Sequence, residues 1–553
     1  MGEAAPDRRS RAGSLGLSSA RTVRDATFEI FRRRGLTTIF SNPGSTEVPF
    51  LAGLPDDLKF VLGLHEGSVL GMATGYAIGR GEPALVLVHT TAGLGNSVGG
   101  IATARVNRAP LVIIVGQQDR RHLVFEPFLA GRLRGLAGEY PVWVDEPVRA
   151  QDVPGAIDRA YHEAATSRGP ALVIVPMDDW LQEADPERED ASAGQVLRAH
   201  AIDEAAVEEL AAFLESGRSP ALVVGAGAGG PETWEALVEL AERLVAPVFQ
   251  ESFGAHAGFP QDHRLFAGVL PADRPRLRER LAPYDVVLVV GAGAFRQSPW
   301  TPGRFTAEGT RVALVTEDPA EAHRSPVELA VLAPPAAAAR SLARRLAQRS
   351  ADPPQPFRSP PPPAPPGPGE PLTASHVLAA LAERLPEEAI VIEEAPVDRP
   401  EIHDRLLARR PLGYVSAAMG GLGFGVPAAA GLRMALPNRP VVAVLGDGAS
   451  LYGIQGLWSA SHYGAGVLYV ILSNGGYVIM DRLAERSGNV GPWPGFGEID
   501  IAALARGFCC PAQRVTTHEE LLTALDETIP TLAGRKEPLL LDVVIAPTTT
   551  FAP

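Results

Sequence analysis

Cysteine is nearly absent from this sequence: the chain of 553 residues has only two, Cys509 and Cys510, and they are adjacent. Neighbouring cysteines provide neither a disulfide framework nor the spaced ligand pairs of a zinc site. Long apolar runs are also missing, so no segment is predicted to span a membrane and no secretory signal is expected. Together these absences predict a cytoplasmic protein.

An excess of basic residues is lacking as well. The chain has 50 Lys and Arg against 64 Asp and Glu, a formal charge of −14, which argues against attraction to nucleic acid or an anionic membrane. The 46% of hydrophobic residues against 21% of charged ones is typical of a packed globular protein. A chain of this length exceeds one core, so we expect about three domains.

Two stretches divide the chain. The proline-rich stretch 352–371 can form neither a helix nor a central strand and is predicted to be an extended linker. The stretch 182–195 is rich in charged and small residues and marks a softer boundary. The predicted parts are a flexible tail over 1–22, domains over 23–182, 196–350 and 372–548, and the linker over 352–371.

Each predicted domain alternates short apolar runs with amphipathic stretches. Continuous apolar strands that alternate with helices indicate parallel sheets covered on both faces, so we predict an α/β protein with three doubly wound parallel-sheet domains. Ligands in such sheets lie at the carboxyl ends of the strands. The predicted strands are 37–41, 84–90, 111–117, 171–176, 221–227, 285–293, 311–316, 389–394, 441–447, 467–474 and 539–546.

An acid between two glycines follows one of these strands, in "VVAVLGDGASLYG" over 441–453. One interpretation of Asp447 is a plain turn, because Asp and Gly are common turn residues. The other is a metal-binding carboxylate, with Gly446 and Gly448 allowing a phosphate to come close.

A second polar residue lies at the end of the next predicted strand of this domain, where Asn474 follows Asp447 by one strand-helix-strand unit. A carboxylate, an amide oxygen and a glycine carbonyl form a ligand set suited to Mg²⁺ or Ca²⁺. The helix that starts near Ala449 and Ser450 would offer backbone amides to a phosphate group.

This pattern resembles the diphosphate motif of thiamine-diphosphate enzymes, and the resemblance covers nearly the whole chain. The runs "FSNPGSTEVPFL", "LGLHEGSVLGMATGYA", "LVHTTAGLGNSVGG" and "VGQQDRR" are similar to the pyrimidine-binding domain of benzoylformate decarboxylase and its relatives. "PALVVGAGAGG" and "DVVLVVGAGAFR" resemble the middle domain of that family, and "WPGFGEIDIAALARGF" its diphosphate-binding domain.

The resemblance implies which residues hold the cofactor, thiamine diphosphate with Mg²⁺ or Ca²⁺. The metal ligands are then Asp447, Asn474 and the carbonyl of Gly476. The cofactor itself is expected to contact Glu66, Glu394, Gly420, Leu422, Gly446, Gly448, Ala449, Ser450 and Tyr477.

The same resemblance implies non-oxidative decarboxylation of a benzoylformate-like 2-keto acid to an aldehyde, through an enamine intermediate. Glu66 would hydrogen-bond the pyrimidine ring of the cofactor and favour its reactive tautomer. From its local window alone, Glu66 is equally well interpreted as an exposed acid at a helix start. His65 beside it is expected to be a packing or hydrogen-bonding residue.

Two further residues bear on catalysis. Ser45 is in a position to cap the helix that begins near Glu47, whereas by resemblance it meets the substrate carboxylate. His89 ends a predicted strand and is either structural or, by resemblance, handles protons near neutral pH. The substrate pocket implied by the family is formed by Ser45, His89, Phe128, Leu129, Ser298, Ile479, Met480 and Leu483.

Ser298 stands where the family has a second active-site histidine. A hydroxyl is a poorer general acid than an imidazole, so slow protonation would leave time for a second carbonyl compound to react. The alternative function is therefore a carboligase, of the acyloin or acetolactate synthase type.

Each site in this family is completed by two subunits, so the resemblance implies at least a homodimer and favours a homotetramer that acts on a small-molecule 2-keto acid. A hypothesis from another class is a nucleotide-binding or regulatory protein that uses "VVGAGAGG", 223–230, as a phosphate loop. As a phosphate-binding signal, this glycine run is weak. A flavin in the middle domain is a further alternative, with no specific motif behind it.

Overall fold

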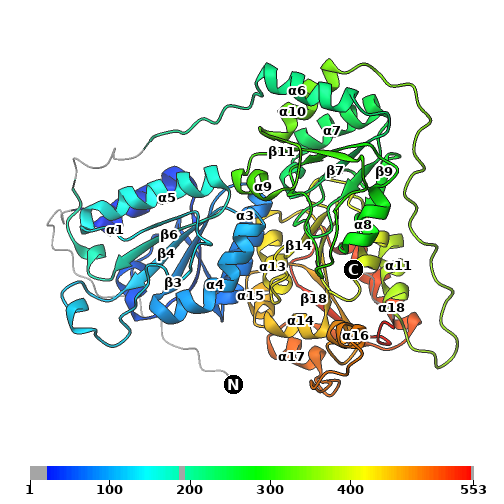
Figure 1. The fold of residues 1–553 in the computed structure, drawn as a ribbon. Helices are drawn as coiled ribbons and strands as arrows, with labels where there is room; N and C mark the ends of the chain where they lie inside the picture. The colour runs from blue at the N-terminus through cyan, green and yellow to red at the C-terminus, as the bar shows by residue number, and fades with distance from the viewer. Residues whose placement is uncertain (1–20, 186–192, 550–553) are drawn as a thin grey trace.

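Three six-stranded parallel sheets, each covered by helices on both faces, form the chain in a computed structural model that describes residues 21–185 and 193–549 (Figure 1). The predicted fold class is thereby confirmed, and the sheets lie within the ranges 23–182, 196–350 and 372–548. The predicted tail 1–22 lies almost wholly outside the described residues, as does part of the boundary 182–195.

The first sheet has the strand order β2-β1-β3-β4-β6-β5. Helices α1 and α5 pack on one face, and α3 and α4 pack on the other. Its elements are α1 (Val23–Arg34), β1 (Thr38–Asn42), α2 (Val48–Leu51), β2 (Lys59–Leu62), α3 (Glu66–Arg80), β3 (Ala84–His89), α4 (Thr90–Val106), β4 (Leu111–Gln117), β5 (Trp143–Asp145), α5 (Val153–Ser167) and β6 (Pro170–Pro176).

The second sheet has the order β12-β11-β10-β7-β8-β9. Helices α6, α7 and α10 cover one face, and α8 packs on the other. Its elements are α6 (Glu204–Glu215), β7 (Pro220–Val224), α7 (Pro231–Leu244), β8 (Val248–Gln250), β9 (Phe266–Val269), α8 (Arg274–Leu281), β10 (Val286–Val290), β11 (Arg311–Thr316), α9 (Pro319–Arg324), β12 (Leu329–Leu332) and α10 (Pro335–Arg345).

The third sheet has the order β14-β13-β15-β16-β18-β17. Helices α11, α12 and α18 cover one face, and α13, α15 and α17 cover the other. Its elements are α11 (Ala374–Arg384), β13 (Ile390–Glu394), α12 (Arg399–Arg405), β14 (Tyr414–Ser416), α13 (Gly425–Ala435), β15 (Val441–Gly446), α14 (Asp447–Tyr452), α15 (Gly456–His462), β16 (Leu468–Ser473), α16 (Val478–Arg486), α17 (Ile501–Gly507), β17 (Ala512–Val515), α18 (His518–Thr528) and β18 (Leu539–Val544).

Helix α3 of the first domain packs directly on α13 of the third, so the two domains share one hydrophobic core (Figure 1). Glycines allow this close approach. A Cβ atom on Gly75 would lie 2.1 Å from the Ala428 carbonyl oxygen, and one on Gly431 would lie 1.9 Å from the carbonyl oxygen of Met72. Because no side chain fits at these distances, the helix pair fixes how the two domains face each other.

The predicted linker has no helix or strand over 351–371 and runs along the outside of the second and third domains (Figure 1). It is nevertheless anchored: the Phe357 amide donates to the Phe266 carbonyl over 2.9 Å, and Arg405 donates to the carbonyls of Pro360 and Pro361. Within the described residues, no helix is long and apolar enough to cross a membrane.

Candidate active site

Asp447 and Asn474 lie where the prediction puts them, at the carboxyl ends of the neighbouring parallel strands β15 and β16. Asp447 Oδ2 accepts the amides of Asn474 (2.9 Å) and Gly475 (2.7 Å), and Oδ1 accepts the amide of Gly448 (2.7 Å). Burial raises the pKa of Asp447, and these three amides oppose that rise. The carboxylate therefore ties two loops together instead of closing a simple turn.

The next residues form the start of the short helix α14. Gly448 lies so close to Tyr477 that a Cβ atom would come within 2.6 Å of the ring, so the aromatic side chain packs over the bare backbone. Ala449 and Ser450 are buried, and the Ser450 hydroxyl donates to the Asp447 carbonyl over 2.7 Å. Only the backbone of these residues thus remains for a phosphate group.

The glycine-rich loop before α13 is held by Glu394, which ends β13. Its carboxylate accepts the amides of Gly423 (2.6 Å) and Gly425 (2.7 Å), and burial raises its pKa to about 8. Gly420 in the same loop has φ +77°, a conformation that favours glycine, and Leu422 is 37% exposed. The loop is therefore preshaped, and Leu422 and Met419 (38% exposed) project from it.

Glu66 is the first residue of α3, but it is not the exposed acid that its neighbours in the sequence alone suggest. It is only 7% exposed, and its Oε2 accepts a hydrogen bond from Asn96 Nδ2 over 3.1 Å. His65 is the N-cap residue, and its Nδ1 accepts the Gly67 amide over 3.0 Å, as expected of a hydrogen-bonding residue. A buried carboxylate with one hydrogen-bond partner among the described residues retains oxygen lone pairs for a ligand.

His89 belongs to a cluster that the sequence does not reveal. Its Nδ1 lies 2.9 Å from Thr46 Oγ1 and 3.0 Å from Glu47 Oε2, and Glu47 is 1% exposed. The carboxylate favours a proton on Nδ1, which leaves Nε2 able to accept or donate one. Glu47 stands two residues after Ser45 in "NPGSTE", and nothing in that local sequence indicates its contact with His89.

Ser45 does not cap the helix, so that interpretation is wrong. It begins a 3-10 turn, Ser45–Glu47, whose N-cap is Gly44, and the Gly44 amide donates to Glu47 Oε2 over 2.7 Å. Glu47 takes the capping role, and Ser45 remains exposed. The serine is thus available for the substrate contact that the resemblance implies.

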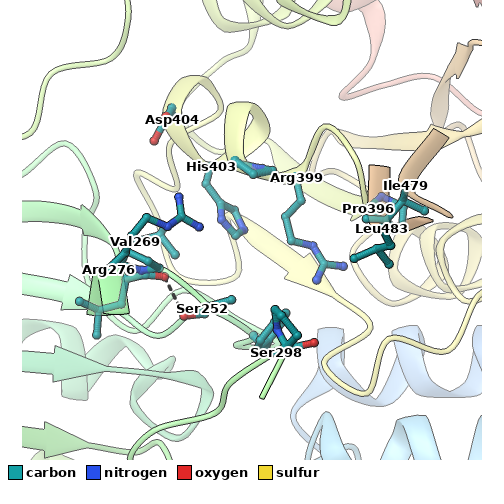
Figure 2. Close-up of a pocket in the computed structure, with 16 residues that line it drawn as sticks. Ser252, Val269, Arg276, Ser298, Pro396, Arg399, His403, Asp404, Ile479 and Leu483 are labelled. Atoms are coloured by element: carbon teal, nitrogen blue, oxygen red, sulfur yellow. Dashed lines mark hydrogen bonds between the residues drawn. The ribbon is translucent and has the colours of Figure 1, made fainter. Parts of the chain in front are cut away.

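A cavity of about 360 Å³ lies between the second and third domains, and Figure 2 shows its lining. Three residues of the expected substrate pocket meet there: Ser298, Ile479 and Leu483. Met480 is not part of this lining, and Phe128 is 87% exposed on the first domain. One chain therefore assembles only part of the expected pocket.

The donor set fits thiamine diphosphate and a divalent metal. A carboxylate offers about four acceptor positions, of which Asp447 uses three for amides, leaving one oxygen lone pair for a cation. A second cavity of about 210 Å³ opens at the same edge and is lined by Asp447 and Asn474 among others. Among the described residues there is no cluster of three His, Cys, Asp or Glu side chains suited to a metal, so the ligands would include the amide and carbonyl oxygens.

Family models of thiamine pyrophosphate enzymes match all three domains. They cover residues 21–133 (N-terminal TPP binding domain), 207–342 (central domain) and 402–543 (C-terminal TPP binding domain). The chain belongs to the thiamine pyrophosphate enzyme family.

The similar proteins include benzoylformate-type decarboxylases and an acetolactate synthase. The chain is 38% identical over 96% of its length to the whole of a benzoylformate decarboxylase of Pseudomonas aeruginosa. It is 28% identical to an acetolactate synthase large subunit of Parasynechococcus marenigrum, over 94% of this chain and 88% of the other. A solved 4-hydroxybenzoylformate decarboxylase of Rhodococcus jostii superposes with a TM-score of 0.91 at 36% identity, covering 96% of this chain and all of the other.

Family membership rules out the hypothesis that the chain is simply a nucleotide-binding or regulatory protein. The run 223–230 contains the last two residues of β7 and the loop at the carboxyl end of that strand, where a phosphate-binding loop would lie. The matching model assigns it to the central domain of the enzyme family. The resemblance deduced from the motifs is thus confirmed over 96% of the chain.

Proposed function

We propose that this enzyme decarboxylates a 2-keto acid of the benzoylformate type to the corresponding aldehyde. The bond between the carboxylate and the keto carbon breaks, CO₂ leaves and a proton takes its place, so no oxidant is needed. Thiamine diphosphate, when bound, supplies the electron sink for this step. The observation that carries the proposal is the Asp447–Asn474 oxygen set in a chain that matches a benzoylformate decarboxylase end to end.

The residues of the chain would bind the cofactor, bind the substrate and transfer protons. Asp447, Asn474 and the Gly476 carbonyl would hold Mg²⁺, with Ca²⁺ as a substitute, and the Gly448 region would meet the diphosphate. Glu66 would hydrogen-bond the pyrimidine ring. Ser45 would bind the substrate carboxylate, and His89, oriented by Glu47, would move protons.

The assembly that we propose is a homotetramer built from dimers, located in the cytoplasm. Its support is the incomplete pocket of the single chain and the apolar surface around Phe128, where Val124 is 78% and Phe125 is 79% exposed. Large uncovered apolar side chains of this kind are typical of protein interfaces. In the dimer, Phe128 and Leu129 would close the pocket of the neighbouring subunit.

A panel of aryl and aliphatic 2-keto acids tests the function. The purified protein, supplied with thiamine diphosphate and Mg²⁺, should release CO₂ and yield a single aldehyde, read by mass spectrometry. Absence of CO₂ from every acid in the panel would contradict the proposal.

Carboligation is the second candidate, because Ser298 lines the cavity where the family has a histidine. If it operates, an added aldehyde should divert product into a 2-hydroxy ketone. Ser298→His should then shift the product ratio back to the free aldehyde, whereas an unchanged ratio would remove Ser298 from the explanation.

A further inference from the structure

Arg399 places a cation on the cavity that contains Ser298, Ile479 and Leu483. It is the first residue of α12, five residues after β13 ends, and its side chain is 18% exposed. In Figure 2 its guanidinium extends from the helix toward the region where Ser298 and Leu483 lie. An arginine is unexpected in a chamber that only has to hold an unsubstituted phenyl ring.

The guanidinium is anchored by one nitrogen only. Arg399 Nε donates to Glu393 Oε2 over 2.8 Å, and Glu393 is fully buried. Within the described part of the chain, the two terminal amino groups of Arg399 have no hydrogen-bond partner. Since Glu393 also accepts from the Tyr414 hydroxyl over 3.0 Å, the arginine is held in a fixed position with donors to spare.

The other polar groups of the cavity do not occupy these donors. His403 hydrogen-bonds the Tyr414 hydroxyl over 2.8 Å, and burial lowers its pKa to about 4, so the imidazole is neutral. Arg276, on the second domain, pairs with Asp273 next to the helix it belongs to. Asp404 also lines the cavity, and within the described residues no hydrogen bond or ion pair joins it to Arg399.

Apart from Ser252, whose hydroxyl donates to the Leu270 carbonyl over 2.7 Å, the rest of the lining is apolar. It includes Pro396, Leu270, Ile479 and Leu483. A ligand that fits such a wall has a hydrophobic body and an anionic end, because a planar guanidinium matches a carboxylate with two parallel hydrogen bonds. The cavity volume of about 360 Å³ lies within the range of small-molecule sites, about 300–1,000 Å³.

We propose that Arg399 selects 2-keto acids whose acyl group ends in a second carboxylate. This inference rests on the proposed decarboxylase function and specifies its substrate class. The reacting keto acid end faces the cofactor, the apolar body lies along Ile479 and Leu483, and the distal carboxylate pairs with the terminal amino groups of Arg399. Loss of that pairing removes a charge-assisted contact without removing any group that takes part in the bond breaking.

Matched substrates test the proposal on the holoenzyme. The aryl pair is 4-carboxyphenylglyoxylate and 4-methylphenylglyoxylate, and the straight-chain pair is 2-oxoadipate and 2-oxohexanoate. In at least one pair, kcat/KM should favour the diacid by about ten- to a hundredfold, the worth of a hydrogen-bonded charge pair. If both neutral partners react as well as the diacids, the inference fails while the decarboxylase function stands; if no acid reacts, the function itself fails.

Variants then assign the preference to one residue. Arg399→Met should abolish the preference and Arg399→Lys should retain part of it, whereas Arg276→Met should retain it in full. Because Arg399→Met leaves Glu393 unpaired, the double variant Arg399→Met with Glu393→Gln serves as a second form in which no buried charge is stranded. A preference that survives in both Arg399→Met forms, or that follows Arg276, overturns the assignment.

A binding measurement separates recognition from turnover. Isothermal titration of each substrate pair into the slow Glu66→Gln holoenzyme should show tighter binding of the diacid, and Arg399→Met should remove the difference. An equal loss of affinity for all four acids would mean that Arg399 binds the carboxylate common to every 2-keto acid, which contradicts the proposal.

Discussion

At the scale of single residues, Gly44 and Gly116 leave the space that the side chains of His89 and Glu47 occupy. A Cβ atom on Gly44 would lie 2.4 Å from His89 Cγ, and one on Gly116 would lie 1.8 Å from Glu47 Oε1. The backbone is therefore shaped around a carboxylate–imidazole pair. Such a pair sets which ring nitrogen carries the proton, which is what a proton-transfer residue requires.

Glu47→Gln keeps the shape of this cluster and removes the negative charge that faces His89 Nδ1. We expect kcat for decarboxylation to fall about tenfold or more, with KM nearly unchanged, because the charge acts on proton transfer and not on substrate binding. The pH profile of kcat should change as well. Glu82→Gln on the surface is the matched control, and an unchanged kcat and profile in Glu47→Gln would show that His89 works without this partner.

The sequence predicts some of these residues and not others for physical reasons. Asp447 and Asn474 follow long buried strands, and strand ends gather at one edge of a parallel sheet, so their proximity is predictable. The proposed role of Glu47 depends on its contact with His89, and that of Arg399 depends on its contact with Glu393. The first of these contacts joins distant segments, and no local pattern marks either one.

At the scale of the elements, the central strands are predictable and the edge strands are not. All eleven predicted runs form strands, and each of the three sheets has them at its centre. The strands that the prediction missed lie at or next to a sheet edge and have three or four residues, as in Trp143–Asp145 and Tyr414–Ser416. These strands are too short to show the continuous apolar run that marks a buried parallel strand.

The close packing of α3 on α13 predicts that a larger side chain between these helices destabilises the fold. Gly431→Ala should lower the free energy of unfolding by about 2 kcal/mol or more, because its Cβ atom would meet the Met72 backbone and force the helices apart. Gly507→Ala is the control, since it is also helical and nothing lies within 4 Å of its Cβ position. Urea unfolding followed by circular dichroism measures both, and equal midpoints would mean that the helices yield without cost.

At the scale of the whole molecule, the proposed site draws residues from two domains and, by our proposal, from two chains. Glu66 belongs to the first domain, whereas Asp447 belongs to the third. If one site takes Glu66 from one subunit and Asp447 from its partner, a mixed dimer of Glu66→Gln and Asp447→Ala chains has one intact site and one doubly damaged site. The arrangement between subunits therefore has a measurable consequence.

Co-expression of the two variants with different tags tests this arrangement. Random pairing should restore about a quarter of the wild-type activity, since half of the dimers are mixed and half of their sites are intact. Dimers that carry both tags should hold all of that activity. If the doubly tagged dimers are as inactive as either variant alone, each site is built within one chain.

Acid stability is another property of the whole fold. Burial lowers the pKa of His256 from 6.5 to about 4, and its Nε2 has no hydrogen-bond partner in the described part of the chain. In the unfolded chain His256 binds a proton below pH 6.5, whereas in the folded chain it stays neutral until about pH 4. The contribution of His256 to the free energy of unfolding is therefore fully present above pH 6.5 and is lost as the pH falls toward 4. His256→Leu should flatten the dependence of the thermal midpoint on pH in this window. An identical slope in wild type and variant would exclude His256 as a contributor.

The central claim is that Asp447 holds a divalent ion against the diphosphate of the cofactor, and equilibrium binding tests it most directly. Titration of thiamine diphosphate into the cofactor-free protein should show that Mg²⁺ tightens binding at least about tenfold, and Asp447→Ala should lose that dependence while the surface control Asp526→Ala keeps it. Binding by Asp447→Ala with undiminished affinity and the same response to Mg²⁺ would contradict the account.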